Sequence, residues 1–172
     1  MAAAIRDDNP VVYLHPYMLT LDKGEVPDGE YVVPLGVADV KRTGTDVTIV
    51  AVGWMVKKAL GAAERLAAEG VNAEVVDPRT LAPLDVSTII NSVKKTKRVV
   101  LVDQAPRHSS AAAVIAGEIA ANAAGTLQAL RMVTALEAPI PYSEPLENYV
   151  VPNEDKIVEA VKSVMAHEAV AA

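Results

Sequence analysis

The sequence contains no cysteine and no phenylalanine, and aromatic residues make up only 3% of its 172 residues. The absence of cysteine excludes disulfide bonds, thiolate metal sites and cysteine nucleophiles, and it fits a reducing compartment such as the cytoplasm. Since aromatic side chains are so few, any hydrophobic core must be built from Ala, Val, Leu and Ile.

Long apolar runs and an excess of positive charge are also missing. No segment approaches the roughly 18 uninterrupted apolar residues of a membrane-spanning helix. The acidic pair Asp7 and Asp8 comes too early for a signal peptide. A net charge of −6 and a sequence pI near 5.1 argue against a nucleic-acid-binding surface. We therefore expect a soluble intracellular protein that binds neither nucleic acid nor membranes.

Apolar residues, which form 51% of the sequence, follow two alternating patterns. Four segments rich in β-branched residues read as buried strands, namely residues 46–53, 73–77, 98–103 and about 127–133. The segments between them repeat apolar residues at helical spacing. This alternation predicts an α/β fold of three layers, α/β/α, in which helices cover both faces of a mostly parallel sheet.

Residues that commonly cap helices stand at the expected places. Asp85 is placed to begin one helix, and Gly70 to end the helix before it. Either Ser109 or Ser110 can begin the next helix, and Asn153 a last amphipathic one.

The two flanks of this region differ from it. Residues 10–14 read as one short strand, separated from the main sheet by about 30 residues rich in Gly, Pro and Asp. A lone strand suggests the tail of another domain. Residues 138–152 contain four prolines and are predicted to form an extended surface loop.

No set of residues with a catalytic or metal-binding spacing is apparent. The three histidines are far apart, and the sequence has neither a nucleophile elbow nor a phosphate-binding loop. Gly53 and Trp54 follow a predicted strand, but without further glycines they indicate a tight turn rather than a dinucleotide site. We therefore assign no catalytic and no cofactor-binding residue.

Ligands of parallel sheets bind at the carboxyl ends of the strands. Arg79, Arg107 and His108 follow two such ends and could form a small cationic crevice. Alternatively, Asp77 and Asp103 pair with these arginines and tie the loops together, which is the interpretation we favour. His108 could serve as an acid or base near neutral pH, yet no acidic residue in its own loop orients it.

Five segments, in order along the chain, resemble one protein family. They are residues 4–12 (A-I-R-D-D-N-P-V-V), 31–42 (Y-V-V-P-L-G-V-A-D-V-K-R), 77–85 (D-P-R-T-L-A-P-L-D), 103–107 (D-Q-A-P-R) and 139–147 (P-I-P-Y-S-E-P-L-E). The sequence resembles the beta subunit of thiamine-dependent 2-oxo-acid decarboxylases. These are the decarboxylating components of the pyruvate, branched-chain and acetoin dehydrogenase complexes.

The resemblance implies a domain organisation and an activity. Residues 1–20 would be the tail of a pyrimidine-binding domain whose body is absent, 21–45 a linker, and 46–172 a transketolase C-terminal-like domain. The full complex would decarboxylate a 2-oxo acid oxidatively and transfer the acyl group to lipoyl-lysine. It would do so in the cytoplasm, or in the mitochondrial matrix of a eukaryote.

The resemblance also implies cofactors and partners. Thiamine diphosphate and magnesium would be bound by the full complex and not by this chain alone, because the glutamate that activates thiamine lies outside this sequence. The partners would be a second copy through the C-terminal domain, an alpha subunit and the dihydrolipoyl acyltransferase core. The chain itself would supply subunit assembly and docking. The rival interpretations are the C-terminal domain of a transketolase or deoxyxylulose-phosphate synthase, and a stand-alone scaffolding module.

A metal site is implied near the start of the chain. By resemblance, main-chain oxygens of Ala4, Ile5 and Asp7, together with Asn9, would hold a potassium ion, with a further ligand from outside this sequence. Oxygen ligands suit a hard monovalent cation. The alternative is an ordinary capped turn, in which Asp7 and Asn9 bond their own backbone.

Overall fold

The computed structural model describes residues 1–166, and its centre is one five-stranded sheet of order β1-β3-β2-β4-β5. Every neighbouring pair is parallel except β1 and β3, which are antiparallel. The strands are β1 (Asp39–Arg42), β2 (Val47–Ala51), β3 (Ala73–Asp77), β4 (Arg98–Pro106) and β5 (Ala129–Ala135).

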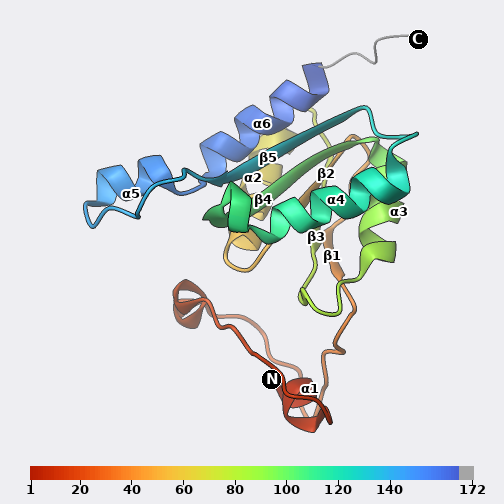
Figure 1. Cartoon of the computed structure of the whole chain (residues 1–172), viewed down its shortest axis with the longest axis vertical. Coiled ribbons are helices and arrows are strands. Elements are labelled where there is room, and N and C mark those ends of the chain that lie inside the picture. Colours follow the sequence, from red (N-terminus) through yellow and green to blue (C-terminus); the bar gives the residue numbers. More distant parts are fainter. Residues whose placement is uncertain (167–172) are drawn as a thin grey trace.

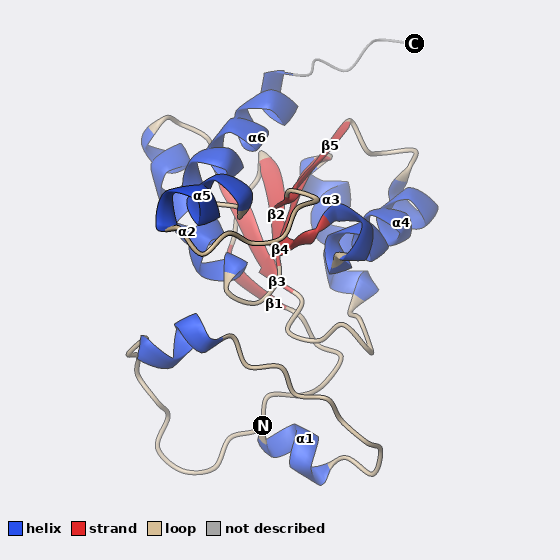
Figure 2. Ribbon diagram, turned by 60° about the vertical axis from the view of Figure 1, so that its left-hand side comes forward, coloured by secondary structure: helices blue, strands red, loops and turns tan. Residues whose placement is uncertain are grey.

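Helices cover both faces of the sheet (Figures 1 and 2). On one face lie α2 (Met55–Ala68) and α6 (Glu154–Ala166), and on the other α3 (Val86–Thr96) and α4 (Ala111–Ala123). The predicted three-layer arrangement with a mostly parallel sheet is therefore confirmed.

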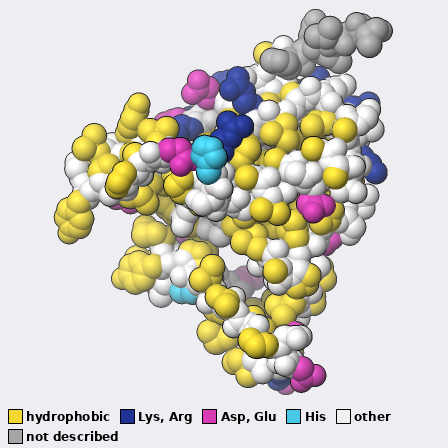
Figure 3. Space-filling view, in the orientation of Figure 1, with side chains coloured by type: hydrophobic (Ala, Val, Ile, Leu, Met, Phe, Trp, Pro, Cys, Tyr) yellow, Lys and Arg dark blue, Asp and Glu magenta, His cyan; other side chains and the backbone are white. Residues whose placement is uncertain are grey.

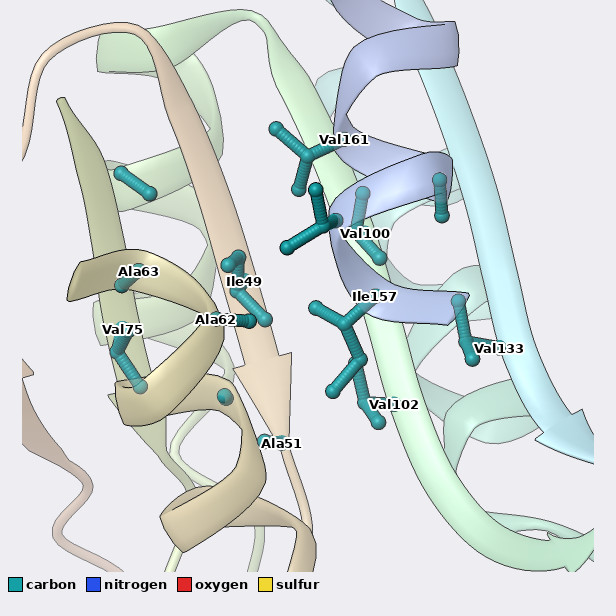
Figure 4. Close-up of a cluster of buried hydrophobic side chains, with 14 of the residues drawn as sticks. Ile49, Ala51, Ala62, Ala63, Val75, Val100, Val102, Val133, Ile157 and Val161 are labelled. Atoms are coloured by element: carbon teal, nitrogen blue, oxygen red, sulfur yellow. The ribbon is translucent and has the colours of Figure 1, made fainter. Parts of the chain in front are cut away.

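The sheet separates two apolar cores. Ile49, Val75 and Val100 face α2 and α6, where Ile157 of α6 packs among them (Figure 4). Residues next to these in the strands, such as Leu101, face α3 and α4. Successive strand residues point to opposite faces, so burial on both sides requires the continuous apolar runs seen in the sequence.

The predicted helix caps are confirmed. Asp85, Ser110 and Asn153 each accept the backbone N–H three residues ahead, at 3.0 to 3.2 Å. Ser110, and not Ser109, is thus the residue that caps α4. Gly70 follows α2 with a φ of +84°, the left-handed conformation in which glycine is favoured.

The strand predicted at residues 10–14 is wrong. These residues are irregular and exposed, between α1 (Ala2–Arg6) and a short 3₁₀ helix, η1 (Tyr17–Leu21). Within the described part of the chain they pair with no strand, and an unpaired segment does not stay a strand.

The loop predicted at residues 138–152 is also wrong in part, because it contains α5 (Glu144–Val150). Pro145 lies in the first turn of this helix, where a missing backbone N–H breaks no intrahelical hydrogen bond. The helix projects from the body of the domain at the left of Figure 1.

One strand was not predicted at all. β1 lies within residues 21–45, the segment predicted as a linker, and pairs with β3 so that Asp39 stands opposite Asp77. The sheet therefore begins before residue 46.

Candidate functional site

At the carboxyl end of β3, charged residues of β1, of β3 and of the loop after β3 form a cluster. Asp77 accepts the backbone N–H of Arg79 at 2.9 Å, while the guanidinium of Arg79 donates to Asp39 of β1 at 2.5 Å. Lys41 also pairs with Asp39, at 2.6 Å. The arginine is thus bound by an acid other than the one we predicted.

Burial and hydrogen bonding set the acidity of the two carboxyl groups in this cluster. The pKa of Asp39 is lowered, chiefly by its hydrogen bond with Lys41 and then by the charges of Lys41 and Arg79. The pKa of Asp77 is raised, because burial disfavours its charged form more than its hydrogen bond to the Arg79 backbone favours it.

At the carboxyl end of β4, Asp103 organises its own loop. One carboxylate oxygen accepts the N–H of Ala105 at 3.2 Å, and the other accepts the N–H of Ala111, the first residue of α4, at 2.8 Å. The predicted pairing of Asp103 with Arg107 is therefore wrong. Both acceptor oxygens are already used by backbone donors.

His108 lies in a short 3₁₀ helix, η2 (Arg107–Ser109), and contacts Glu137, which follows β5. The ring Nδ1 lies 2.8 Å from Oε1 of Glu137, and the same oxygen accepts the backbone N–H of His108 at 3.1 Å. These hydrogen bonds lower the pKa of Glu137. The histidine side chain is 87% exposed, so nothing shields this pair from water.

A shallow cavity of about 460 Å³ lies between β5 and α6. Arg107, Arg131 and Lys156 line it together with Glu137 and Glu159. Figure 3 shows the blue, magenta and cyan side chains gathered on this face. Arg79 pairs instead with β1 at the other edge of the sheet, so the crevice predicted from Arg79, Arg107 and His108 is not assembled.

Two of the basic side chains that line this cavity make structural contacts. Lys156 donates to backbone carbonyls at the end of α5, including that of Val151 at 2.8 Å, and burial lowers its pKa. Arg131 donates to the hydroxyl of Ser163 at 2.9 Å. These contacts join α5, α6 and β5 rather than converge on a reacting atom.

The residues implied in potassium binding lie at and just after α1. Ala4 and Ile5 belong to its last turn, where backbone carbonyls have no intrahelical donor. Asp7 Oδ1 accepts both the backbone N–H and the side-chain amide of Asn9, each at 2.9 Å, and these bonds lower the pKa of Asp7. The capped turn is therefore present, and carbonyl and carboxylate oxygens stand beside it.

The described residues 1–166 contain no group of three or more His, Cys, Asp or Glu placed to hold a metal ion. They also contain no helix long and apolar enough to cross a membrane.

Comparison with known proteins gives a family match and close relatives. Residues 36–157 match the family model for the transketolase C-terminal domain. The beta subunit of acetoin:2,6-dichlorophenolindophenol oxidoreductase from Cupriavidus necator is 43% identical over 163 residues, covering 94% of this chain and 48% of the relative. The beta subunit of the pyruvate dehydrogenase E1 component from Bacillus subtilis is 41% identical over 167 residues, covering 96% and 51%.

Solved structures agree. A structure described as a split-gene transketolase, inactive beta4 tetramer, has a TM-score of 0.71 and 27% identity, covering 85% of this chain and 46% of its own. A 2-oxoglutarate:ferredoxin oxidoreductase from Magnetococcus marinus, at a TM-score of 0.52 and 18% identity, covers 75% of this chain and 19% of its own and shares the fold alone.

The predicted resemblance to dehydrogenase beta subunits is thereby confirmed. The chain spans about half the length of the curated relatives it matches. From its mixed sheet, its three layers and the match over residues 36–157, the chain belongs to the transketolase C-terminal domain family.

Proposed function

We propose that this chain is the C-terminal part of the beta subunit of a thiamine-dependent 2-oxo-acid dehydrogenase component. In the full complex the reaction is oxidative decarboxylation of a 2-oxo acid with acyl transfer to lipoyl-lysine. The observation that carries the proposal is the identity of 41 to 43% to beta subunits over 94 to 98% of this chain. The function belongs in the cytoplasm, or in mitochondria as the name of the Dictyostelium discoideum relative states.

Within that complex, this chain supplies subunit assembly and docking of the acyltransferase. The segment 136–152, which we call the α5 arm, supports this role. It carries Ile140, Tyr142, Leu146 and Tyr149, whose exposed fractions run from 55% to 105%. The yellow side chains at the upper left of Figure 3 are those of this arm. Exposed apolar patches commonly mark protein interfaces, and the partners are a second copy, an alpha subunit and the acyltransferase core.

Thiamine diphosphate and magnesium belong, in this proposal, to the full complex. In support, the acids at the strand ends make structural hydrogen bonds. Asp77 and Asp103 accept backbone N–H groups of their own loops, and Glu137 accepts that of His108.

A potassium ion in the full subunit would be held by Ala4, Ile5, Asp7 and Asn9. In support, Ala4 and Ile5 lie in the last turn of α1, where backbone carbonyls have no intrahelical donor. The chain alone supplies only part of the ligand sphere, so it binds potassium weakly in this proposal.

The experiment is a chimera. The matching half of the Bacillus subtilis pyruvate dehydrogenase beta subunit is replaced by this chain and produced with the Bacillus alpha subunit. Assembly is followed by sedimentation, and thiamine-dependent oxidation of pyruvate by reduction of 2,6-dichlorophenolindophenol. We expect an assembled, active complex, and no calorimetric binding of thiamine diphosphate to the chain alone.

Two outcomes would contradict the proposal. A chimera that folds, by circular dichroism, but never binds the alpha subunit would favour a scaffolding module. Thiamine binding or turnover by the chain alone would show that it builds its own cofactor site.

Transketolase is the second candidate function, because the chain is 27% identical to a split-gene transketolase. Adding a ketose phosphate and an aldose phosphate to the same sample tests it.

A further inference from the structure

We propose that the loop between β3 and α3 is a latch that fixes the direction in which residues 1–35 leave the domain. The loop comprises residues 78–85 and is called the latch loop below. It contacts the backbone just before β1, at Gly36 and Ala38. The proposal concerns this junction between the sheet and the segment that precedes it.

Two side chains of the latch loop take backbone N–H groups of the preceding segment. The hydroxyl of Thr80 accepts the N–H of Gly36 at 3.0 Å, and Oδ2 of Asp85 accepts the N–H of Ala38 at 3.0 Å. Both bonds lie just before the point at which β1 begins to pair with β3, at Asp39. They therefore fix the backbone that leads into β1 to the latch loop.

Both acceptors are oriented by further hydrogen bonds. The Thr80 hydroxyl donates to the carbonyl of Pro83 at 2.7 Å, which leaves its lone pairs for Gly36. Asp85 caps α3 and also accepts the hydroxyl of Thr88 at 2.7 Å, and these bonds hold its pKa far below its usual range. The acceptors are thus in position without rearrangement.

The backbone at Gly36 is shaped for this contact. Its φ is +73°, and a Cβ at this position would lie 3.0 Å from Cγ of Pro83. Glycine satisfies both conditions, because it adopts a positive φ readily and has no side chain to meet the proline. On the other side of the junction, the guanidinium of Arg79 donates a hydrogen bond to the carboxylate of Asp39 in β1.

Before Gly36, the domain holds the chain only lightly. Residues 1–34 are mostly exposed, and the ion pair between them and the domain, Lys57 with Asp22 at 2.5 Å, is itself exposed. Exposed pairs of this kind contribute little. Figure 2 shows this segment lying apart from the three layers. The hydrogen bonds of the latch loop therefore hold the point at which residues 1–35 leave the domain.

The consequence for assembly rests on the proposed function, whereas the latch itself does not. If residues 1–20 belong to a neighbouring domain, the latch sets the angle between that domain and the sheet. Thr80 and Asp85 are then positioning residues for the subunit.

The first test measures direction and uses the absence of native cysteine. Spin labels are placed on the full chain through Val33→Cys and Lys94→Cys, both exposed positions. We expect a narrow distribution of label distances, which Thr80→Val broadens, because valine keeps the shape of threonine but cannot accept the Gly36 N–H. Ser110→Ala is the matched control, since it removes a helix cap without touching the junction.

The second test measures hydrogen exchange at single amides by NMR. Thr80→Val should speed exchange of the Gly36 amide roughly two- to tenfold, the effect of one lost hydrogen bond. In Asp85→Ser the serine can still cap α3, but its single hydroxyl is too short to accept the Ala38 N–H as well. Hydrogen exchange of the Ala38 amide should therefore speed up by a similar factor. Rates are taken relative to the buried Val100 amide, which corrects for any loss of global stability.

The outcomes separate the latch from the proposed function. If distances and relative exchange in Thr80→Val match those of Ser110→Ala, the latch is overturned. If they change as expected, the chimera with Thr80→Val tests the consequence. Reduced binding of the alpha subunit would support it, and unchanged binding would overturn it. If even the wild-type chimera fails to assemble, the proposed function fails while the latch stands.

Discussion

Glu137 holds His108 at two points, through the backbone N–H at 3.1 Å and the ring Nδ1 at 2.8 Å. The contact joins the segment after β4 to the segment after β5, the two strands at one edge of the sheet. It orients the imidazole while leaving it open to water.

We expect Glu137→Ala to leave the free energy of unfolding almost unchanged, because an exposed ion pair contributes little to stability. The same change should alter the NMR signal of the His108 ring, since Nδ1 loses its partner. Urea unfolding and imidazole NMR check the two statements, with Glu159→Ala on α6 as control. A large loss of stability would contradict the first.

Stability should fall in acid. The folded-state pKa of Asp85 lies below its ordinary value of 3.8, so its contribution is fully present above that value and is lost as the pH falls through the folded pKa. Urea unfolding at pH 7, 4 and 3 should therefore show a declining free energy below about pH 4. Asp85→Asn should decline less steeply, and an equally steep decline would refute the assignment.

Ionisation of Asp77 should change the free energy of unfolding in the opposite direction to ionisation of Asp85. Burial raises its pKa in the folded state, so its ionised form destabilises the protein at neutral pH, and the penalty disappears as the pH falls through the raised pKa. Asp77→Asn keeps an oxygen to accept the Arg79 N–H. We expect it to increase the free energy of unfolding at pH 7 and to have a smaller effect at pH 3. Asp39→Asn, whose pKa is lowered, should destabilise at pH 7.

Gly44 should tolerate no side chain. A Cβ there would lie 2.3 Å from the backbone of both Ala73 and Glu74. Gly44→Ala should therefore cost about 1–3 kcal/mol in unfolding free energy. Gly117→Ala is the matched control, because nothing lies within 4 Å of that position in α4. It should instead stabilise the helix, by up to about 1 kcal/mol.

The core beneath α6 should be sensitive to truncation. Ile157 is fully buried beneath α6, which packs on β4 and β5, so Ile157→Ala should cost about 2–5 kcal/mol. Val114 on α4 is 64% exposed, and Val114→Ala should change the free energy by less than about 0.5 kcal/mol. Equal effects in urea unfolding would show that α6 is not packed as described.

Much of the fold could be predicted because its signals are local. The strands at Val47–Ala51 and Ala73–Asp77 are buried on both faces, so their sequences are mainly apolar, with Thr48 and Glu74 as buried polar exceptions. The caps of α3 and α4 are single residues that bond a backbone N–H three positions ahead. In each case the deciding interaction lies within the segment itself.

The elements and contacts that the sequence does not predict depend on residues far away in the sequence. β1 is four residues long with only partial burial, and β3, its partner, lies on the far side of α2 in the sequence. Glu137 lies 29 residues from His108, so only the adjacency of β4 and β5 could have indicated their contact. The prolines of residues 138–152 predict a loop, but Pro145 lies in the first turn of α5, where proline is permitted.

The pairing of β1 with β3 also imposes an order on synthesis. A ribosome releases residues 39–42 well before residues 73–77, and β3 is the one strand beside which β1 lies. During synthesis β1 therefore has no strand to pair with until α2 and β3 have emerged. The hydrogen bonds of Thr80 and Asp85 to the backbone before β1 can form only after residue 85 has left the exit tunnel.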